Sequence, residues 1–436
     1  MGNANKKNSN KNNSNNEVLY MPDNIYIPPL TKYKYFERRV PYMTEELEYS
    51  KEEEKLLSEL KPDKINLTEF AKNNDQDKIK VIIDTDIGTD WDDAMAIAYA
   101  LNLQNIEILG ITTNYGIPDL RANITKKIID AYIKKNPQKA PIPVISGASR
   151  PLGTHRELLI YGHEGMPFYD QSILKKAIDM KTITKREQEK AAKFIVSTVK
   201  KYPNQVKIIS IGIPTNIGLA LKNNKDIIPL IKEIIIMGCG SFIVNDKPIG
   251  YDPITEIKNG HIINLYPNHN ISGDTIASKI LFDSCIPTKI ISHSVSSDFW
   301  AEGPIIDFLR ERANNIKDIN NSDDPEGVVG LLMKEWFSIR RQKGQCPHDP
   351  LAVNEAVFGG DKSPILYARG RIILTEWAGF STFIPQENGS HYLGGFIVMP
   401  SFNHFTALLV SDLKANNTLD YFCYDGLNRG GIVLNN

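Results

Sequence analysis

The fold is decided by residues 81–98, which read VIIDTDIGTDWDDAMAIA. The β-branched run 81–83 is typical of a buried strand, and the run that begins at Ala94 is typical of a helix. In α/β proteins a strand-to-helix turn of this kind lies at the carboxyl edge of the sheet, where ligands bind. Between the two runs, five carboxylates occupy ten consecutive positions: Asp84, Asp86, Asp90, Asp92 and Asp93.

The same alternation of short apolar runs and helical patterns continues along the chain. This order predicts an α/β fold, with a mostly parallel central sheet flanked by helices in the manner of a Rossmann-like open sheet, and with an N-terminal extension. Strands are predicted at 79–83, 107–112, 206–213, 233–237, 289–293 and 370–375. Helices are predicted at 92–102, 120–135, 186–201, 275–283 and 325–343.

The residues before the first strand differ in composition from the rest. The segment 1–16 contains eight Asn and three Lys, so we expect a disordered tail. Aromatic residues alternate with prolines in 17–43, and 44–61 has a charged helical pattern. We therefore expect 17–77 to be an extension that packs on the body and 78–430 to form the main domain. The role of the two N-terminal segments stays open.

Composition excludes several classes of protein. The 436 residues include 51 Lys and Arg against 52 Asp and Glu, a balance that argues against a nucleic-acid binder and a basic membrane-surface protein. No run approaches the ~18 apolar residues that span a bilayer, and the first residues show no secretory signal. The four cysteines are widely spaced, unlike a disulfide framework or a paired-cysteine zinc site. We expect a soluble cytoplasmic protein.

The clustered carboxylates repel one another, and crowding raises their pKa values unless a positive charge neutralises them. The positive end of the following helix is one candidate, with Asp90 or Asp92 as its cap, but a cap uses only one or two carboxylates. A divalent cation with oxygen ligands is the other candidate. The acidic turn has three other interpretations. They are a solvated acidic turn, an EF-hand, which no preceding helix supports, and the Asp-x-Asp turn of haloacid-dehalogenase phosphatases, in which Thr or Val usually replaces Gly88.

Other segments of the chain carry related motifs. Residues 144–152 read VISGASRPL, 212–216 read GIPTN, and 346–353 read CPHDPLAV. Residues 162–165 read GHEG, and the sequence Asn-His-Asn at 268–270 is followed by Asp274. The acidic turn itself carries two residues more than the pattern Asp-x-Asp-x-Gly-x-Asp-Asp-Ala. Together these segments resemble the nucleoside hydrolases of the inosine-uridine-preferring group.

The resemblance implies a calcium-dependent hydrolase of the N-glycosidic bond of ribonucleosides, which releases ribose and free base in purine or pyrimidine nucleoside metabolism. Asp86 would activate a calcium-held water, and His348 would protonate the leaving base. The resemblance assigns the Ca²⁺ ligands to Asp86, Asp93, Asp349 and the backbone carbonyl of Thr215. It assigns the substrate contacts to Asp92, Asn270, Met237 and Asn268.

On the residues alone, other interpretations stay open. Asp349 also suits the cap of a helix over 350–357, and Thr215 suits the start of a helix. The chain departs from the family at Ile117, where the family has Asn, and at Asn268, where it has Glu. These two departures leave the base preference open.

Two classes of function therefore compete. The first is the nucleoside hydrolase, whose partner is a small-molecule nucleoside, with a homo-oligomer as a further expectation and with no nucleic acid or membrane. The second is a non-catalytic relative that binds ribose or a ribosyl group; a hydrolase of another N-ribosylated small molecule is a variant of the first. Asp86 and His348 favour an enzyme, because a binding module needs neither. The long segment 240–268 is a candidate lid.

Overall fold

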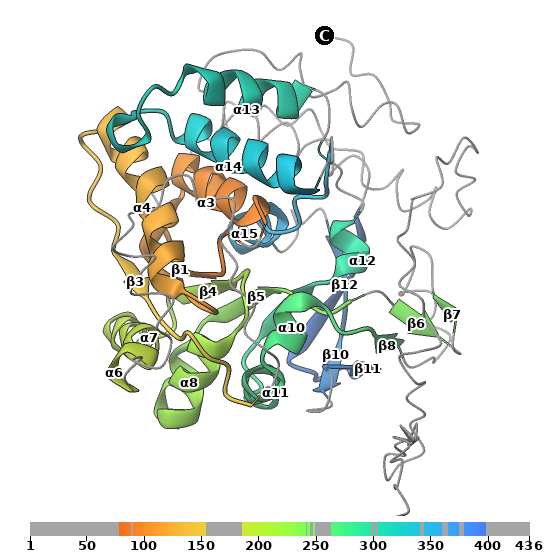
Figure 1. Ribbon diagram of the computed structural model, residues 1–436. Coiled ribbons are helices and arrows are strands. Elements are labelled where there is room, and N and C mark those ends of the chain that lie inside the picture. Colours follow the sequence, from red (N-terminus) through yellow and green to blue (C-terminus); the bar gives the residue numbers. More distant parts are fainter. Residues whose placement is uncertain are drawn as a thin grey trace, which may run out of the picture. The chain divides into compact units, whose positions relative to one another are not determined.

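A computed structural model describes most of the main domain (Figure 1). The predicted tail 1–16, the predicted extension 17–77 and the motif at 162–165 lie outside the described residues, as does most of the segment 240–268. These four predictions therefore stay predictions. The described residues are 78–88, 90–153, 185–240, 242–244, 247–248, 263–297, 301, 304–340, 344–359, 365–374 and 379–397.

The described strands form one sheet with a parallel and an antiparallel part. The parallel part has the order β3 (Val144–Ser146), β2 (Ile106–Thr113), β1 (Ile79–Thr85), β4 (Val206–Ser210), β5 (Glu233–Met237), β9 (Thr288–Ile291) and β12 (His391–Ile397). The antiparallel part continues with β10 (Ile365–Leu374), β11 (Ser381–Pro385), β8 (Ile263–Leu265), β6 (Phe242–Val244) and β7 (Lys247–Pro248). The predicted α/β class is confirmed. The antiparallel part was not predicted, because an apolar run does not reveal the direction of its partner.

Helices cover both faces of the parallel part. Along β1 the buried side chains alternate, so that Val81 and Ile83 join one hydrophobic core and Ile82 joins the other. The first core includes helices α3 (Asp92–Asn102), α4 (Pro118–Lys135), α13 (Pro304–Asn315), α14 (Pro325–Arg340) and α15 (Pro350–Phe358), drawn in the upper part of Figure 1. The second core includes α7 (Lys190–Lys201), α8 (Thr215–Asn223) and α11 (Thr275–Asp283). Burial on both faces explains the nearly continuous β-branched runs of these strands.

The local pattern located several helices closely. Helices α3 and α11 have the predicted bounds, and α14 begins at the predicted residue. The helix predicted at 186–201 is divided into α6 (Lys185–Gln188) and α7, and α13 was not predicted. The short helices are η4 (Lys225–Leu230), α10 (His269–Gly273), α12 (His293–Ser296) and η5 (Ile319–Asn321). Within the described ranges, no helix is both long and apolar enough to cross a membrane.

Candidate active site

The acidic turn follows β1 at the carboxyl edge of the parallel strands, as the sequence predicts. Gly88 has a φ of 97°, in the region that favours glycine. Gly212, in the loop after β4, packs directly against the turn, because a Cβ at this position would lie 2.4 Å from the backbone nitrogen of Asp86. The loop before α8 therefore approaches the acidic turn with no side chain between the two backbones.

The carboxylates of the turn are not used to cap the helix that follows. Helix α3 begins at Asp92, and its N-cap residue is Trp91, which makes no side-chain cap bond. The carboxylate of Asp90 accepts a hydrogen bond from Gln345, and Oδ2 of Asp92 accepts one from the backbone nitrogen of His348 at 3.0 Å. Neither candidate cap, Asp90 or Asp92, is the N-cap residue of α3: each carboxylate accepts a hydrogen bond from the next backbone nitrogen and a second one from the segment before α15.

Three carboxylates from two distant segments converge at this place. Asp92 and Asp93 at the start of α3 meet Asp349, which precedes α15, and one oxygen of each lies within 4.8 Å of the others. Their residues are 5%, 2% and 3% exposed, respectively. Asp349 occupies the N-cap position of α15 but makes no side-chain cap bond. A plain capping role therefore does not account for Asp349.

Burial and mutual repulsion raise the pKa values of this group. Burial raises the pKa of Asp92 to about 6, and the charge of Asp86 adds to the shift. For Asp93 and Asp349 burial again contributes most, and neighbouring carboxylates push both pKa values well above the usual range. Thr85 donates a hydrogen bond to Asp93, which lowers the pKa of Asp93 and partly offsets the effect of burial. Such a group favours either bound protons or a bound cation.

The fully buried carboxylate of Asp84 stabilises the start of the turn through hydrogen bonds with surrounding side chains. It accepts hydrogen bonds from Thr112 at 2.6 Å, from Asn216 at 2.8 Å and from Asn114 at 3.2 Å. Burial nevertheless raises the pKa of Asp84 to about 7. The carboxylate thus joins the ends of β1 and β2 to the start of α8.

Thr215 is the first residue of α8, and its N-cap residue is Pro214. Its hydroxyl donates to Oδ2 of Asp274 at 2.8 Å, and the same oxygen accepts from the backbone nitrogen of Leu152 at 2.7 Å. Burial raises the pKa of Asp274, whose other oxygen caps α11. The hydroxyl of Thr215 therefore has a structural partner, and the predicted role for its backbone carbonyl stays a prediction.

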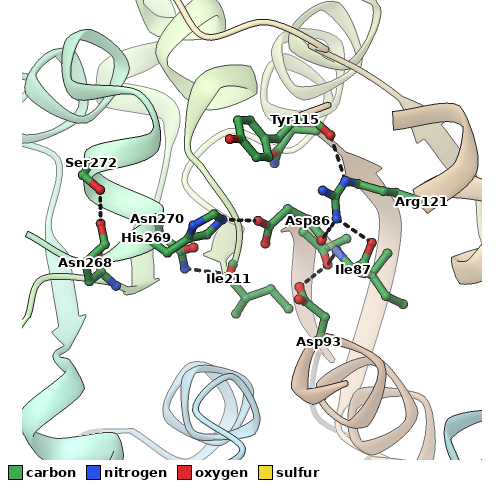
Figure 2. A network of polar contacts seen from close by, with 12 residues as sticks. Asp86, Ile87, Asp93, Tyr115, Arg121, Ile211, Asn268, His269, Asn270 and Ser272 are labelled. Carbon is green, nitrogen blue, oxygen red and sulfur yellow. Dashed lines mark hydrogen bonds and ion pairs between the residues drawn. The ribbon is translucent and has the colours of Figure 1, made fainter. Parts of the chain in front are cut away.

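Asp86 lies beside the three-carboxylate group and contacts a histidine (Figure 2). Its Oδ2 is 3.2 Å from Nε2 of His269, the first residue of α10. Asp86 is 2% exposed, and its charge contributes to the raised pKa values of Asp92 and Asp93. The predicted trio of Asp86, Asp93 and Asp349 is thus brought into one neighbourhood, and Asp92 is the third member of the tight group in place of Asp86.

The predicted substrate contacts Asn270, Met237 and Asn268 lie together at the ends of β5 and α10. The amide nitrogen of Asn270 donates to the backbone carbonyls of Ile211 and Met237, both at 2.9 Å. These two bonds use both amide hydrogens, so Asn270 can offer a substrate only its carbonyl oxygen. Oδ1 of Asn268 accepts from the backbone nitrogen of Ile271 at 3.0 Å and so caps α10.

His348 has a fixed ring orientation. Its Nδ1 lies 2.8 Å from Oγ of Ser296, whose hydroxyl donates to the carbonyl of Ser292 at 3.1 Å. Because the Ser296 hydroxyl already donates its hydrogen to Ser292, it accepts from His348, and the ring proton of His348 lies on Nδ1. Nε2 is then the ring nitrogen that can exchange a proton with a ligand. The ring packs against His293 with centroids 4.9 Å apart, and burial followed by the His293 charge lowers the pKa of His348 well below its usual range.

The residues 81–379 match the family model described as inosine-uridine preferring nucleoside hydrolase. The match contains the acidic turn, the loop before α8, α10 and the segment before α15. The chain belongs to this family. Membership in the nucleoside hydrolase family confirms the predicted family and fold.

Curated relatives of the nucleoside hydrolase family carry names of pyrimidine enzymes. The chain is 28% identical to uridine nucleosidase 1 of Arabidopsis thaliana over 221 residues, which cover 50% of this chain and 57% of that protein. It is 26% identical to the probable uridine nucleosidase 1 of Oryza sativa subsp. japonica over 295 residues, which cover 62% of this chain and 82% of that protein. The match thus spans little more than half of the Arabidopsis protein.

Solved structures of other nucleoside hydrolases share the fold. An inosine-guanosine nucleoside hydrolase superposes with a TM-score of 0.56 at 20% identity, over 78% of this chain and 99% of that one. A purine-preferring ribonucleoside hydrolase from Gardnerella vaginalis gives a TM-score of 0.52 at 22% identity, over 77% of this chain and all of that one. At these identities the likeness concerns the fold alone.

The donor set fits the hard cation that a nucleoside hydrolase of this family implies. Carboxylate oxygens are the ligands that calcium and magnesium prefer. In the part of the chain that the structure describes, no lysine or arginine forms an ion pair with Asp92, Asp93 or Asp349. A buried group of three carboxylates with raised pKa values could hold a metal ion.

Sequence reasoning missed three residues of this nucleoside hydrolase site. His269 is the middle residue of the motif Asn-His-Asn at 268–270, and a titratable imidazole inside a motif is the sequence signal that could have identified it. Arg121 lies in α4, where no motif marks it, yet its guanidinium donates to the backbone carbonyls of Asp86 and Ile87. His293 lies in α12, and only the fold brings its ring to His348.

Proposed function

We propose that the protein hydrolyses the N-glycosidic bond of ribonucleosides, with a divalent cation, calcium, at the acidic group. The observation that carries the proposal is the convergence of Asp92, Asp93 and Asp349 from two segments some 250 residues apart, beside Asp86. Uridine is the first substrate to test, because curated relatives bear the name uridine nucleosidase. A cytoplasmic location and a homo-oligomer belong to the same proposal and rest on composition and resemblance alone.

In the proposed reaction the chain supplies a general base, residues that bind the ribose, and a general acid. When bound, a hard divalent cation would lower the pKa of a water and orient sugar hydroxyls. Asp86 would accept a proton from the attacking water, as the base of an inverting glycoside hydrolysis does. The carbonyl oxygen of Asn270 would accept a hydrogen bond from a ribose hydroxyl, Asp92 would accept another, and Met237 would pack on the sugar.

His348 would protonate the leaving base through Nε2. Its Nδ1 proton is engaged by Ser296, so only Nε2 can deliver a proton to the substrate. The lowered pKa of His348 keeps the free ring neutral, so the proton that Nε2 would pass to the base would be taken up from solvent when the substrate binds, and the ring would return to its neutral form after the transfer. Protonation of the leaving group matters most for bases that leave poorly as anions.

The test is a reducing-sugar assay over a panel of nucleosides, with calcium and with a chelator. Release of ribose in calcium, and its loss in the chelator, would support the proposal. Ribose or nucleoside binding without release of sugar would instead support a non-catalytic ribosyl-binding relative. Release of ribose from another N-ribosylated small molecule, with none from nucleosides, would change the substrate and keep the bond that is broken.

A further inference from the structure

A histidine outside the predicted catalytic pair holds the carboxylate of Asp86. Nε2 of His269 lies 3.2 Å from Oδ2 of Asp86, and the two side chains are 41% and 3% exposed, respectively. Because an ionised carboxylate only accepts hydrogen bonds, the proton of this contact is on Nε2. Figure 2 shows the ring of the more exposed histidine pointing toward the carboxylate of the buried aspartate.

The direction of the His269 ring is fixed from two sides. The helix α10 that carries it begins at a capped end, where the side chain of Asn268 accepts from the nitrogen of Ile271 at 3.0 Å. The ring of Tyr115 meets the His269 ring edge to face, with centroids 5.8 Å apart and an angle of 81° between the planes. The imidazole thus has little freedom to turn away from the carboxylate.

Tyr115 is held in place in an uncommon conformation. Its φ is 66°, which costs a residue other than glycine of the order of 1–3 kcal/mol. Its backbone nitrogen donates to the carbonyl of Ala148 at 2.7 Å, and its carbonyl accepts from Nε of Arg121 at 2.8 Å. Non-glycine residues in this region persist where the surroundings fix them, and they cluster at functional sites.

Arg121 joins Tyr115 to the backbone of the acidic turn. Its fully buried guanidinium donates through Nη1 to the carbonyl of Asp86 and, at 2.8 Å, to the carbonyl of Ile87. Asp86 is therefore held at both ends, its backbone by Arg121 and its carboxylate by His269. Arg121 and His269 contact Asp86 from α4 and α10, and Tyr115, from the loop between β2 and α4, contacts both of them (Figure 2).

We propose that His269 is a positioning residue for the hydrolysis: its hydrogen bond to Oδ2 of Asp86 fixes the side-chain torsion of the carboxylate that would accept the proton of the water. The inference rests on the proposed function, in which Asp86 is the base. Hydrogen-bond partners of a metal-binding carboxylate typically contribute about 10–100-fold to metal affinity or activity. A histidine with a purely structural role would more often be buried among apolar groups, whereas His269 is exposed at the site.

The test compares His269→Gln with His269→Phe. The glutamine amide can still donate to Asp86, whereas the phenylalanine ring keeps the edge contact with Tyr115 and loses the donor. We expect His269→Phe to lower kcat by about 10–100-fold with uridine and with p-nitrophenyl riboside alike, and His269→Gln to restore most of it. The affinity for calcium, measured by calorimetry, should weaken in the order wild type, Gln, Phe. Lys126→Ala, on the exposed side of α4, is the matched control for preparation and folding.

Several results would overturn the role. These are a His269→Phe variant with wild-type kcat and wild-type calcium affinity, a loss confined to KM, which indicates a sugar contact, and a loss confined to uridine, which indicates a leaving-group contact. If wild type hydrolyses no nucleoside, the proposed function fails, and calcium calorimetry alone then decides whether His269 supports Asp86. A thermal melt checks that each variant is folded, and His269→Ala replaces the Phe variant if that one is not.

Discussion

The two ends of the parallel sheet bury acidic groups in opposite ways. At the amino-terminal ends of β4, β5 and β9, each carboxylate faces a lysine. Nζ of Lys207 lies 3.0 Å from Glu233, and Nζ of Lys289 lies 2.6 Å from Glu355. Lys289 is also 3.8 Å from Glu233, so the four groups form one network of zero net charge. At this end the chain supplies its own cations.

At the carboxyl end, the buried carboxylates outnumber the cations that reach them from the residues that the structure describes. Asp92, Asp93 and Asp349 lie within 4.8 Å of one another, and the charge of Asp86 acts on all three. Arg121 lowers the pKa of Asp93, but its guanidinium donates to backbone carbonyls of the turn. Burial raises the pKa values of the three carboxylates most, and the neighbouring negative charges raise them further.

One helix contributes to both ends. Asp349 precedes the first turn of α15, and Glu355 follows six residues later, about 9 Å along the axis. Among the described residues, one carboxylate of this helix thus has a lysine partner, whereas the other lies in an acidic group that could hold a metal ion. The comparison teaches that an unpaired buried acidic group marks a binding site, whereas a paired one marks a structural network.

The largest expected difference between the two ends of the sheet is in turnover after a carboxylate is replaced by an amide. Asp86→Asn keeps the shape of the side chain but cannot accept a proton from water, so turnover should fall on the order of 10²–10⁴-fold for every nucleoside. The measurement is kcat with uridine and with p-nitrophenyl riboside in saturating calcium. Glu355→Gln, the same chemical change at the other end of the sheet, is the control that should keep most of its activity. Near-wild-type turnover of Asp86→Asn would remove Asp86 as the base.

The next largest effect tests whether His348, at the carboxyl end of the sheet, acts as the general acid or as a positioning residue. His348→Ala should slow purine nucleosides steeply, on the order of 10²-fold, because their bases need protonation to leave. It should change the hydrolysis of p-nitrophenyl riboside little, because that leaving group needs no acid. The ratio of kcat values for inosine and the activated riboside is the readout. An equal loss with both substrates would show that His348 positions the sugar or Asp349 and is not the acid.

A stability measurement should show the opposite pattern at the two ends. Glu355→Gln leaves the half-buried ammonium of Lys289 without its close carboxylate, which should cost about 1–3 kcal/mol in the free energy of unfolding. Asp349→Asn removes one of three repelling carboxylates, so in a chelator it should cost nothing or stabilise the protein. Urea unfolding of both variants in EDTA checks the prediction. A larger loss for Asp349→Asn than for Glu355→Gln would contradict it.

The smallest expected effect is a change in how stability depends on pH. The pKa values of folded Asp84 and Asp92 are about 7 and about 6, above their usual 3.8, so the folded state holds these protons more tightly. In a chelator, stability from these groups is therefore full at low pH and lost as pH rises through those values. Calcium should reverse the trend, because the cation binds the ionised carboxylates. Melting temperatures from about pH 4 to about pH 8, with calcium and with EDTA, test this. Curves that coincide at every pH would show that no cation binds there.

Much of the site could be predicted because its residues stand in short local patterns. The acidic turn joins a strand and a helix whose periods differ, and the segment before α15 carries His348 and Asp349 side by side. Parallel strands bring their carboxyl ends to one edge, so the meeting of these two segments follows from the predicted fold class. Of the two candidates for neutralising the turn, the cap of α3 by Asp90 or Asp92 is not the one that the structure shows, because the start of a helix in sequence does not reveal where its side chains turn.

The sequence by itself determined the α/β class, the bounds of α3 and α11, and the two acidic segments that approach the candidate site, because period, charge spacing and motif are local properties. Only the tertiary structure decided which oxygens meet. It grouped Asp92 with Asp93 and Asp349, turned Asp86 toward His269, and gave Glu355 a lysine, whereas no lysine in the described part of the chain pairs with Asp349. These outcomes depend on side-chain torsions and on neighbours hundreds of residues away, and such contacts leave no periodic trace in the chain. For the same physical reason, Arg121 and the antiparallel part of the sheet became visible only in the folded molecule.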